Sequence, residues 1–200
     1  MAKTWCAGSG ECLRTLEGHG DRVFSAAFSP DGREVLTAMG DGKAKIWCAG
    51  FEERLRTLEG HGGHVNSAVF SPDGRQVVTA AGDGTARVWC AVSGECLRTL
   101  DHGMHVNVLS AVFSPDGQEV LTASTDGTAK IWCAGSGERL STLLGRQSGQ
   151  MSVKCAVFSP DGQEVLSATS DDGTARIWSL GSRECVLTLR CVHAAAFSPA

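Results

Sequence analysis

Apolar and β-branched residues along this chain occur in short runs, and glycine, proline, serine or aspartate bounds each run. One unit reads VFSAAFSPDGREVLTAMGDGKAKIWCAGFEERLRTLEGH and contains four such runs. They predict one strand that ends at Phe28 and three more over 34–38, 43–47 and 54–58. Because the runs are short and glycine is frequent, we expect an all-β fold rather than a helical repeat.

The segment FSPDG separates the first two runs and recurs at 28–32, 70–74, 113–117 and 158–162, with a last copy, FSPA, at 197–200. In Ser29-Pro30-Asp31-Gly32, proline stands second and glycine fourth, as a type I turn prefers. All five prolines of the chain lie in these segments. Each segment is therefore predicted to be the turn of a β-hairpin.

The spacing of tryptophan gives the length of the repeat. The five residues are Trp5, Trp47, Trp89, Trp132 and Trp178. A period of roughly 40 to 45 residues is typical of the four-stranded blades of a β-propeller. A single blade leaves both faces of its sheet uncovered, so it must stack on its neighbours.

Aligning the repeats predicts a single domain over 1–200. It would have a partial blade over 1–16, complete blades over approximately 19–58, 61–100, 105–143 and 152–189, and a partial strand over 192–197. Two arrangements fit this pattern. One is an incomplete, open ring from a longer array, and the other is a compact ring in which 192–197 meets 2–5 and 13–16. An open arc exposes strand edges, which favours self-association.

Composition and charge argue against a protein that binds nucleic acid and against one that is secreted or inserted in a membrane. The net charge is −4, and no cluster of lysine and arginine suggests a nucleic-acid surface. The N-terminal MAKTWCAGSG has no apolar segment typical of a signal peptide, and no run approaches the roughly 18 residues of a membrane helix. We therefore expect a cytoplasmic or nuclear protein that binds neither nucleic acid nor membrane.

The nine cysteines occupy repeated positions, after tryptophan, in Glu-Cys pairs, or just before a strand. No Cys-x-x-Cys pair and no Cys/His cluster has zinc spacing. The sequence predicts reduced thiols that pack as small apolar residues, with neither a metal site nor a cofactor.

Several segments resemble the WD40 repeat family of β-propellers. They are TLEGH at 57–61, the FSPDG turns, LTASTDGTAKIW at 121–132 and the tryptophan that ends each third strand. The Trp-Asp pair typical of the family is Trp-Cys at 47, 89 and 132 and Trp-Ser at 178. The resemblance implies four complete antiparallel blades and a partial fifth.

The same resemblance implies a buried hydrogen-bonded tetrad of His, Ser or Thr, Asp and Trp in each well-formed blade. The matching residues are His19, Thr37, Asp41 and Trp47; His61, Thr79, Asp83 and Trp89; Thr122, Asp126 and Trp132; and Asp172 and Trp178.

The later blades depart from the histidine position of the first two tetrads. His102 and His105 lie 11 and 8 residues before Phe113, whereas His19 and His61 lie 9 residues before their phenylalanines. Neither is predicted to fit in register, so the third tetrad is expected to lack a good histidine or to bulge. Arg146 replaces histidine before the fourth blade, in a loop that is expected to be mobile.

A set of hydroxyl, histidine and aspartate also suggests a hydrolase triad. A nucleophile occurs once, in a cleft beside an oxyanion hole, whereas this set repeats at core positions. The repeated Asp-Gly turns lack the Asp-x-Asp-x-Asp pattern of calcium loops. The chain is therefore not expected to be an enzyme.

The resemblance favours a non-catalytic scaffold that binds partner proteins or peptides on one propeller face. The residues flanking the valine that opens each first strand, and the residue before the turn aspartate, vary between repeats. The predicted partner-binding residues are Arg22, Phe24, Gly40, His64, Asn66, Gly82, Thr125, Ser152, Lys154 and Asp171. Two alternatives are the sensor part of a larger protein, such as an NTPase-linked regulator, and a propeller with a ligand-binding or catalytic channel.

Overall fold

The computed structural model describes residues 2–50, 54–144, 152–169, 173–190 and 196–197. Every regular element in these ranges is a β-strand. The strands are β1 Ala2–Trp5, β2 Cys12–Leu16, β3 Val23–Phe28, β4 Glu34–Met39, β5 Lys43–Cys48, β6 Arg54–Glu59, β7 Val65–Phe70, β8 Gln76–Ala81, β9 Thr85–Cys90, β10 Cys96–Asp101, β11 Val108–Phe113, β12 Glu119–Ser124, β13 Thr128–Cys133, β14 Arg139–Leu144, β15 Val153–Phe158, β16 Glu164–Thr169, β17 Ala175–Ser179 and β18 Cys185–Leu189.

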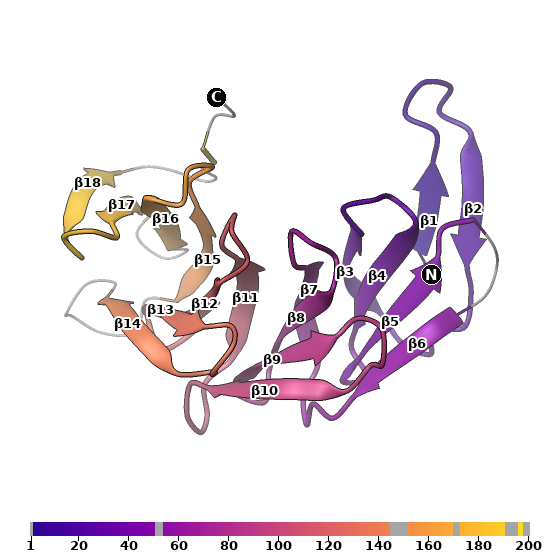
Figure 1. Cartoon of the computed structure of the whole chain (residues 1–200), viewed down its shortest axis with the longest axis horizontal. Coiled ribbons are helices and arrows are strands. Elements are labelled where there is room, and N and C mark those ends of the chain that lie inside the picture. The colour runs from indigo at the N-terminus through magenta and orange to yellow at the C-terminus, as the bar shows by residue number, and fades with distance from the viewer. Residues whose placement is uncertain (1, 51–53, 145–151, 170–172, 191–195, 198–200) are drawn as a thin grey trace.

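These strands form four antiparallel sheets of four strands, β3–β6, β7–β10, β11–β14 and β15–β18, and a two-stranded sheet, β1–β2. Figure 1 shows the sheets following one another along an open arc, from β1–β2 at one end to β15–β18 at the other. The inner strands β3, β7, β11 and β15 contact one another in that order. The predicted all-β propeller of four blades and a partial one is confirmed, and its ring is not closed.

The Ser-Pro-Asp-Gly turns carry their own hydrogen bonds. Ser29 Oγ donates to Asp31 Oδ1 at 2.6 Å and accepts from the Glu34 amide at 2.8 Å. The Gly32 amide donates to the Ser29 carbonyl at 2.9 Å, and Gly32 has a φ of 71°, in the region that favours glycine. The same bonds recur from Ser71, Ser114 and Ser159. Each hairpin is thus fixed by residues within five positions of one another.

The core lies between the blades. Leu36 and Ile46 of one blade are fully buried against Phe70 and Trp89 of the next blade. The following two interfaces repeat the arrangement with Val78 and Val88 against Phe113, and with Leu121 and Ile131 against Phe158. Burial of apolar area between blades is therefore what holds the arc together.

The two-stranded sheet covers only part of the first blade. Leu16 and Ala2 pack on Val35 and Trp47, and Arg14 donates to the Cys48 and Ala49 carbonyls at 3.2 and 3.0 Å. Phe28 of β3 remains 57% exposed, whereas its counterpart Phe70 is 9% exposed. The open end of the arc therefore presents an apolar sheet face to solvent.

The compact-ring alternative does not match the described part of the C-terminal segment. Ala196 and Phe197 are not in a strand, and they line a cavity with Phe113, Pro115 and Phe158 rather than with β1 or β2. Residues 192–195 of the predicted partial strand lie outside the described residues.

The prediction that the cysteines pack as small apolar residues is wrong for part of the set. Cys12, Cys96 and Cys185 are exposed, and the other five described cysteines are half-buried. The positions after tryptophan and in the Glu-Cys pairs lie at the ends of the outer two strands, where solvent reaches them.

Candidate functional site

The second blade holds a continuous chain of hydrogen bonds through all four predicted tetrad residues. His61 Nδ1 lies 3.0 Å from Asp83 Oδ2, and His61 Nε2 lies 2.7 Å from Thr79 Oγ1. Trp89 Nε1 donates to the same Thr79 oxygen at 2.8 Å. Asp83 also accepts from the Gly62 amide at 2.8 Å, which ties the loop before β7 to the turn after β8.

These distances fit a neutral His61. With the proton on Nδ1, the ring donates to Asp83 and accepts the Thr79 hydroxyl proton at Nε2, so every group is paired. Burial lowers the pKa of His61, although Asp83 opposes that shift. Burial alone would raise the pKa of Asp83, but hydrogen bonds from Thr85, Gly62 and His61 lower it. The pair is thus a neutral imidazole beside an ionised carboxylate.

The first blade contains the same residue types but a different set of bonds. Trp47 Nε1 donates to Thr37 Oγ1 at 2.9 Å, as in the second blade. His19 is 4% exposed, yet neither of its ring nitrogens has a hydrogen-bond partner in the described residues. Its ring lies over Trp47, with the centroids 4.7 Å apart and the planes at 34°. The predicted tetrad of this blade is therefore incomplete at His19.

The third blade corrects the expectation about its histidine. His102 is 8% exposed, and its Nε2 lies 2.7 Å from Thr122 Oγ1, to which Trp132 Nε1 also donates. His102 Nδ1 lies 3.7 Å from Asp126 Oδ2. The extra residues are accommodated after the histidine, where Gly103 and His105 have φ of 109° and 62°. The loop bulges there, so His102 keeps its place despite its longer spacing.

The fourth blade retains the hydroxyl and the tryptophan. Trp178 Nε1 donates to Ser167 Oγ at 2.9 Å. Asp172 and Arg146 lie outside the described residues. Ser167 was missed as a tetrad position, although the motif VLSAT at 165–169 aligns it with Thr37 and Thr79.

The hydroxyls of these tetrads are unsuited to nucleophilic chemistry. Thr37, Thr79 and Thr122 are fully buried, and each accepts the indole hydrogen of its tryptophan. A nucleophile must reach a substrate, which these buried oxygens do not. The tetrads therefore brace the blades.

Two of the predicted partner-binding residues meet across the first blade interface. The rings of Phe24 and His64 lie with their centroids 5.9 Å apart. Phe24 is 52% exposed, and Arg22 and His64 are also exposed. The Gly40 amide donates to the Arg22 carbonyl, and the Gly82 amide donates to the His64 carbonyl, both at 2.9 Å. These backbone bonds hold the side chains at the ends of their strands.

A second group of predicted residues is linked by hydrogen bonds. Asn66 Nδ2 donates to Asn107 Oδ1 and to the Val108 carbonyl, both at 2.7 Å. The Asn107 amide in turn donates to Thr125 Oγ1 at 2.9 Å. Asn107 precedes the buried Val108 as His64 precedes Val65, so the valine register could have identified it from the sequence.

The remaining predicted partner-binding residues either belong to the fourth blade or are glycines. Lys154 is exposed and Ser152 is half-buried at the start of β15, while Asp171 lies outside the described residues. At Gly40 and Gly82 an added Cβ would lie 2.8 Å from Asp21 Oδ2 and 2.6 Å from His64 Cε1. Glycine at these two positions leaves room for the side chains of Asp21 and His64 and offers no side chain to a partner.

In the described part of the chain there is no helix that could cross a membrane and no group of three potential metal ligands.

The repeats were also compared with known proteins. The family model described as "WD domain, G-beta repeat" matches residues 10–48, 52–90, 94–133 and 137–179. No curated protein matches the chain. Each match begins before an outer strand and ends at the third strand of the following sheet, so the sequence repeats and the structural blades are out of phase. Four consecutive matches cover most of the sequence, and the chain belongs to the WD40 repeat family.

Proposed function

We propose that this chain is a non-catalytic scaffold that binds partner proteins or peptides on the face that carries Arg22, Phe24, His64 and Asn66. WD40 repeats are generally protein-interaction scaffolds and are typically non-catalytic. The observation that carries the assignment to this face is the exposed Phe24 ring beside His64. Exposed aromatic and arginine side chains are the groups that most often dominate binding energy at interfaces.

The framework below these residues supports the proposal. The valine that opens each first strand is buried in the second, third and fourth blades, at 0%, 0% and 1% exposure for Val65, Val108 and Val153. The residues before these valines are His64, Asn107 and Ser152, which differ in size and in their hydrogen-bonding groups. Different side chains on a constant framework are what recognition of a specific partner requires.

The test uses peptides selected on the immobilised protein from a displayed random library. The double variant Arg22→Ala with Phe24→Ala is expected to bind the selected peptides at least about tenfold more weakly, while its melting temperature stays the same. A matched control, Arg75→Ala with Val92→Ala, removes an arginine and an apolar residue that are also exposed. Equal binding by both double variants would contradict the assignment to this face.

A further inference from the structure

The loop that leads into β11 is longer than its counterparts and carries an exposed methionine. His102 lies 11 residues before Phe113, whereas the histidines of the first two tetrads lie 9 residues before their phenylalanines. Met104 belongs to this longer loop and is 84% exposed. The next residue, His105, has a φ of 62°, which residues other than glycine rarely adopt. Strained backbone and exposed large apolar side chains both occur where a loop binds a ligand or a partner.

At the end of the same loop, an asparagine pair leaves one acceptor and one donor unused. Asn66 Nδ2 donates both of its hydrogens, to Asn107 Oδ1 and to the Val108 carbonyl, each at 2.7 Å. Because a carbonyl only accepts, these bonds fix the orientation of both amides. Asn66 Oδ1 and Asn107 Nδ2 then have no hydrogen-bond partner among the described residues. A free acceptor and a free donor match the N–H and C=O groups of a polypeptide backbone.

The charged groups on this face are unevenly paired. Asp83, Asp101 and Asp126 each accept hydrogen bonds from nearby backbone or hydroxyl groups. Lys154 and Arg22 are exposed, and neither has an ion-pair partner among the described residues. The charges left free beside these bonded carboxylates are therefore positive. Complementary charge favours a partner that brings carboxylates to this face.

Further blades would not cover these positions. The second and third blades each stack on a complete blade on both sides, through the contacts of β7 with β3 and β11 and of β11 with β7 and β15. His64 and Met104 of these two blades are nevertheless exposed. Stacking thus buries the faces of the sheets and leaves the loops at the strand ends open. The occupant is accordingly a segment that lies across these loops, and not another repeat.

We propose that this face binds an acidic, extended segment of another polypeptide, in which carboxylates flank an apolar side chain. The proposal rests on the proposed function and deepens it, because it states the chemistry of the partner. The apolar side chain packs on Met104, and the segment's backbone bonds to Asn66 Oδ1 and Asn107 Nδ2. A carboxylate of the segment pairs with Lys154. The apolar contact supplies affinity, and the charges supply specificity and faster association.

The test compares two displayed libraries of short peptides on the immobilised protein. One library draws its residues from Asp, Glu, Leu, Phe, Ser and Gly, and the other has Lys and Arg in place of Asp and Glu. We expect the acidic library to be retained at least about tenfold better. A retained acidic peptide is then labelled and titrated by fluorescence anisotropy. Its affinity should fall as the salt concentration rises, because salt screens the exposed charges.

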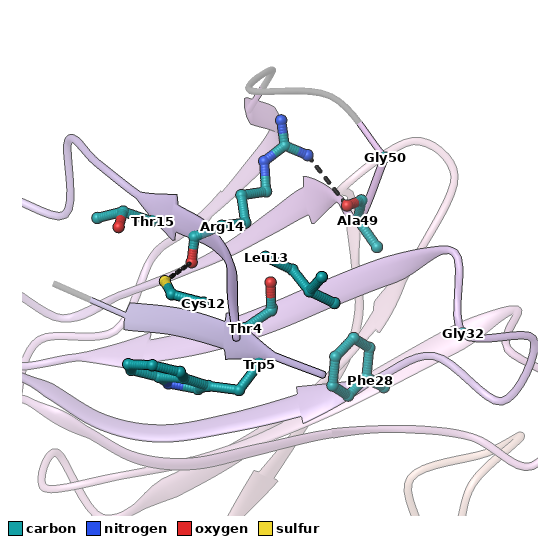
Figure 2. Close-up of a pocket in the computed structure, with 10 residues that line it drawn as sticks. All are labelled: Thr4, Trp5, Cys12, Leu13, Arg14, Thr15, Phe28, Gly32, Ala49 and Gly50. Carbon is teal, nitrogen blue, oxygen red and sulfur yellow. Dashed lines mark hydrogen bonds between the residues drawn. The ribbon is translucent and has the colours of Figure 1, made fainter. Parts of the chain in front are cut away.

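A methionine variant tests the apolar contact. Met104→Ser should weaken binding of the retained peptide at least about tenfold, while the melting temperature stays the same because the side chain is exposed. The matched control is Leu13→Ser, which removes a 66% exposed apolar side chain. Figure 2 shows Leu13 at a cavity beside β1 and β2, another exposed apolar space that a peptide could enter. This control should bind the peptide as the unmodified protein does.

Two further variants test the polar contacts. Asn107→Asp keeps the acceptor that Asn66 needs but removes the free donor, so it should weaken binding about threefold to tenfold. Lys154→Glu should have an effect of similar size, about threefold to tenfold. Its control is Arg75→Glu, which makes the same change of charge at an exposed side chain in the turn after β7 and should leave binding unchanged.

Three results would overturn the proposal. They are equal retention of the two libraries, unchanged binding by Met104→Ser, and a dimer in light scattering that Met104→Ser dissociates. The dimer would assign the methionine to a contact with a second copy. If a retained peptide loses affinity in the Arg22→Ala and Phe24→Ala double variant but not in Met104→Ser, the proposed function stands and this proposal fails. If neither variant changes the affinity, both fail.

Discussion

The interface between the first two complete blades and the interface before the first blade contain the same residue types but are packed differently. At the former, Ala68, Phe70 and Trp89 are 1%, 9% and 2% exposed. At the latter, Ala26 and Phe28 are exposed, and only Trp47 is covered, by Leu16 of the two-stranded sheet. The comparison shows that a blade's own sequence does not determine whether the face of its sheet is buried. The number of strands in the preceding sheet decides it.

The largest expected difference between the two ends concerns tryptophan. Trp89→Ala should lower the free energy of unfolding by about 3–5 kcal/mol, because a buried ring is lost and Thr79 loses its donor. Trp5→Ala, at a 57% exposed site, should lower it by about 1 kcal/mol or less. Chemical denaturation followed by circular dichroism measures both values. Similar losses at the two positions would mean that the open end is packed like the interior.

The histidines give a smaller difference. His61→Ala should lower the free energy of unfolding by about 1–3 kcal/mol, because Thr79 and Asp83 lose a partner in a buried site. His19→Ala should cost less, since the described residues offer its ring nitrogens no hydrogen bond to lose.

His102→Ala sharpens the same comparison. Its loss should resemble that of His61→Ala, because His102 is bonded to Thr122 and lies beside Asp126. A value near that of His19→Ala in the same denaturant titration would restore the expectation that its longer spacing displaces it.

Acidification should produce the smallest effect. Burial lowers the pKa of His61 and His102. Histidines of the unfolded chain have a pKa of about 6.5, so the folded protein binds fewer protons at these two residues than the unfolded chain does. The stability that the two neutral histidines contribute is therefore fully present above about pH 6.5, and it decreases as the pH falls below that value.

The carboxylates act at lower pH. Burial by itself would raise the pKa of Asp126, but the His102 ring 3.7 Å away and hydrogen bonds from Ser124 and Thr128 hold it well below its usual range. Its contribution is lost only as the pH falls below the ordinary value near 3.8. Melting temperatures measured between pH 7.5 and about 4.5 should therefore report the histidines. The double variant His61→Ala with His102→Ala should flatten the curve, and an unchanged curve would contradict the assignment.

The sequence by itself determined the turns and strands whose hydrogen bonds join residues close together in the chain. Each Ser-Pro-Asp-Gly turn closes its own hydrogen bonds within five positions, and the structure extends the predicted strands 34–38, 43–47 and 54–58 by one residue each. The tryptophan to hydroxyl bond is also fixed by register, because Thr79 and Trp89 lie on adjacent strands of one hairpin. Such bonds follow from the repeat wherever the hairpin forms.

Only the tertiary structure decided which histidines are bonded and which faces are buried. His61 lies 22 positions from Asp83, and the two meet because the loop before β7 packs on the turn after β8. His102 reaches Thr122 despite its spacing, since the bulge at Gly103 and His105 takes up the extra residues, whereas His19 in the expected register stays unpaired. Phe28 and Phe70 occupy the same position in identical Phe-Ser-Pro-Asp-Gly segments. Phe28 is exposed and Phe70 is buried because the preceding sheet has two strands at Phe28 and four at Phe70. Hydrogen bonds within a turn or hairpin are determined by residues close together in the sequence. Burial and the long-range hydrogen bonds of the histidines depend instead on the loops and blades that pack against them.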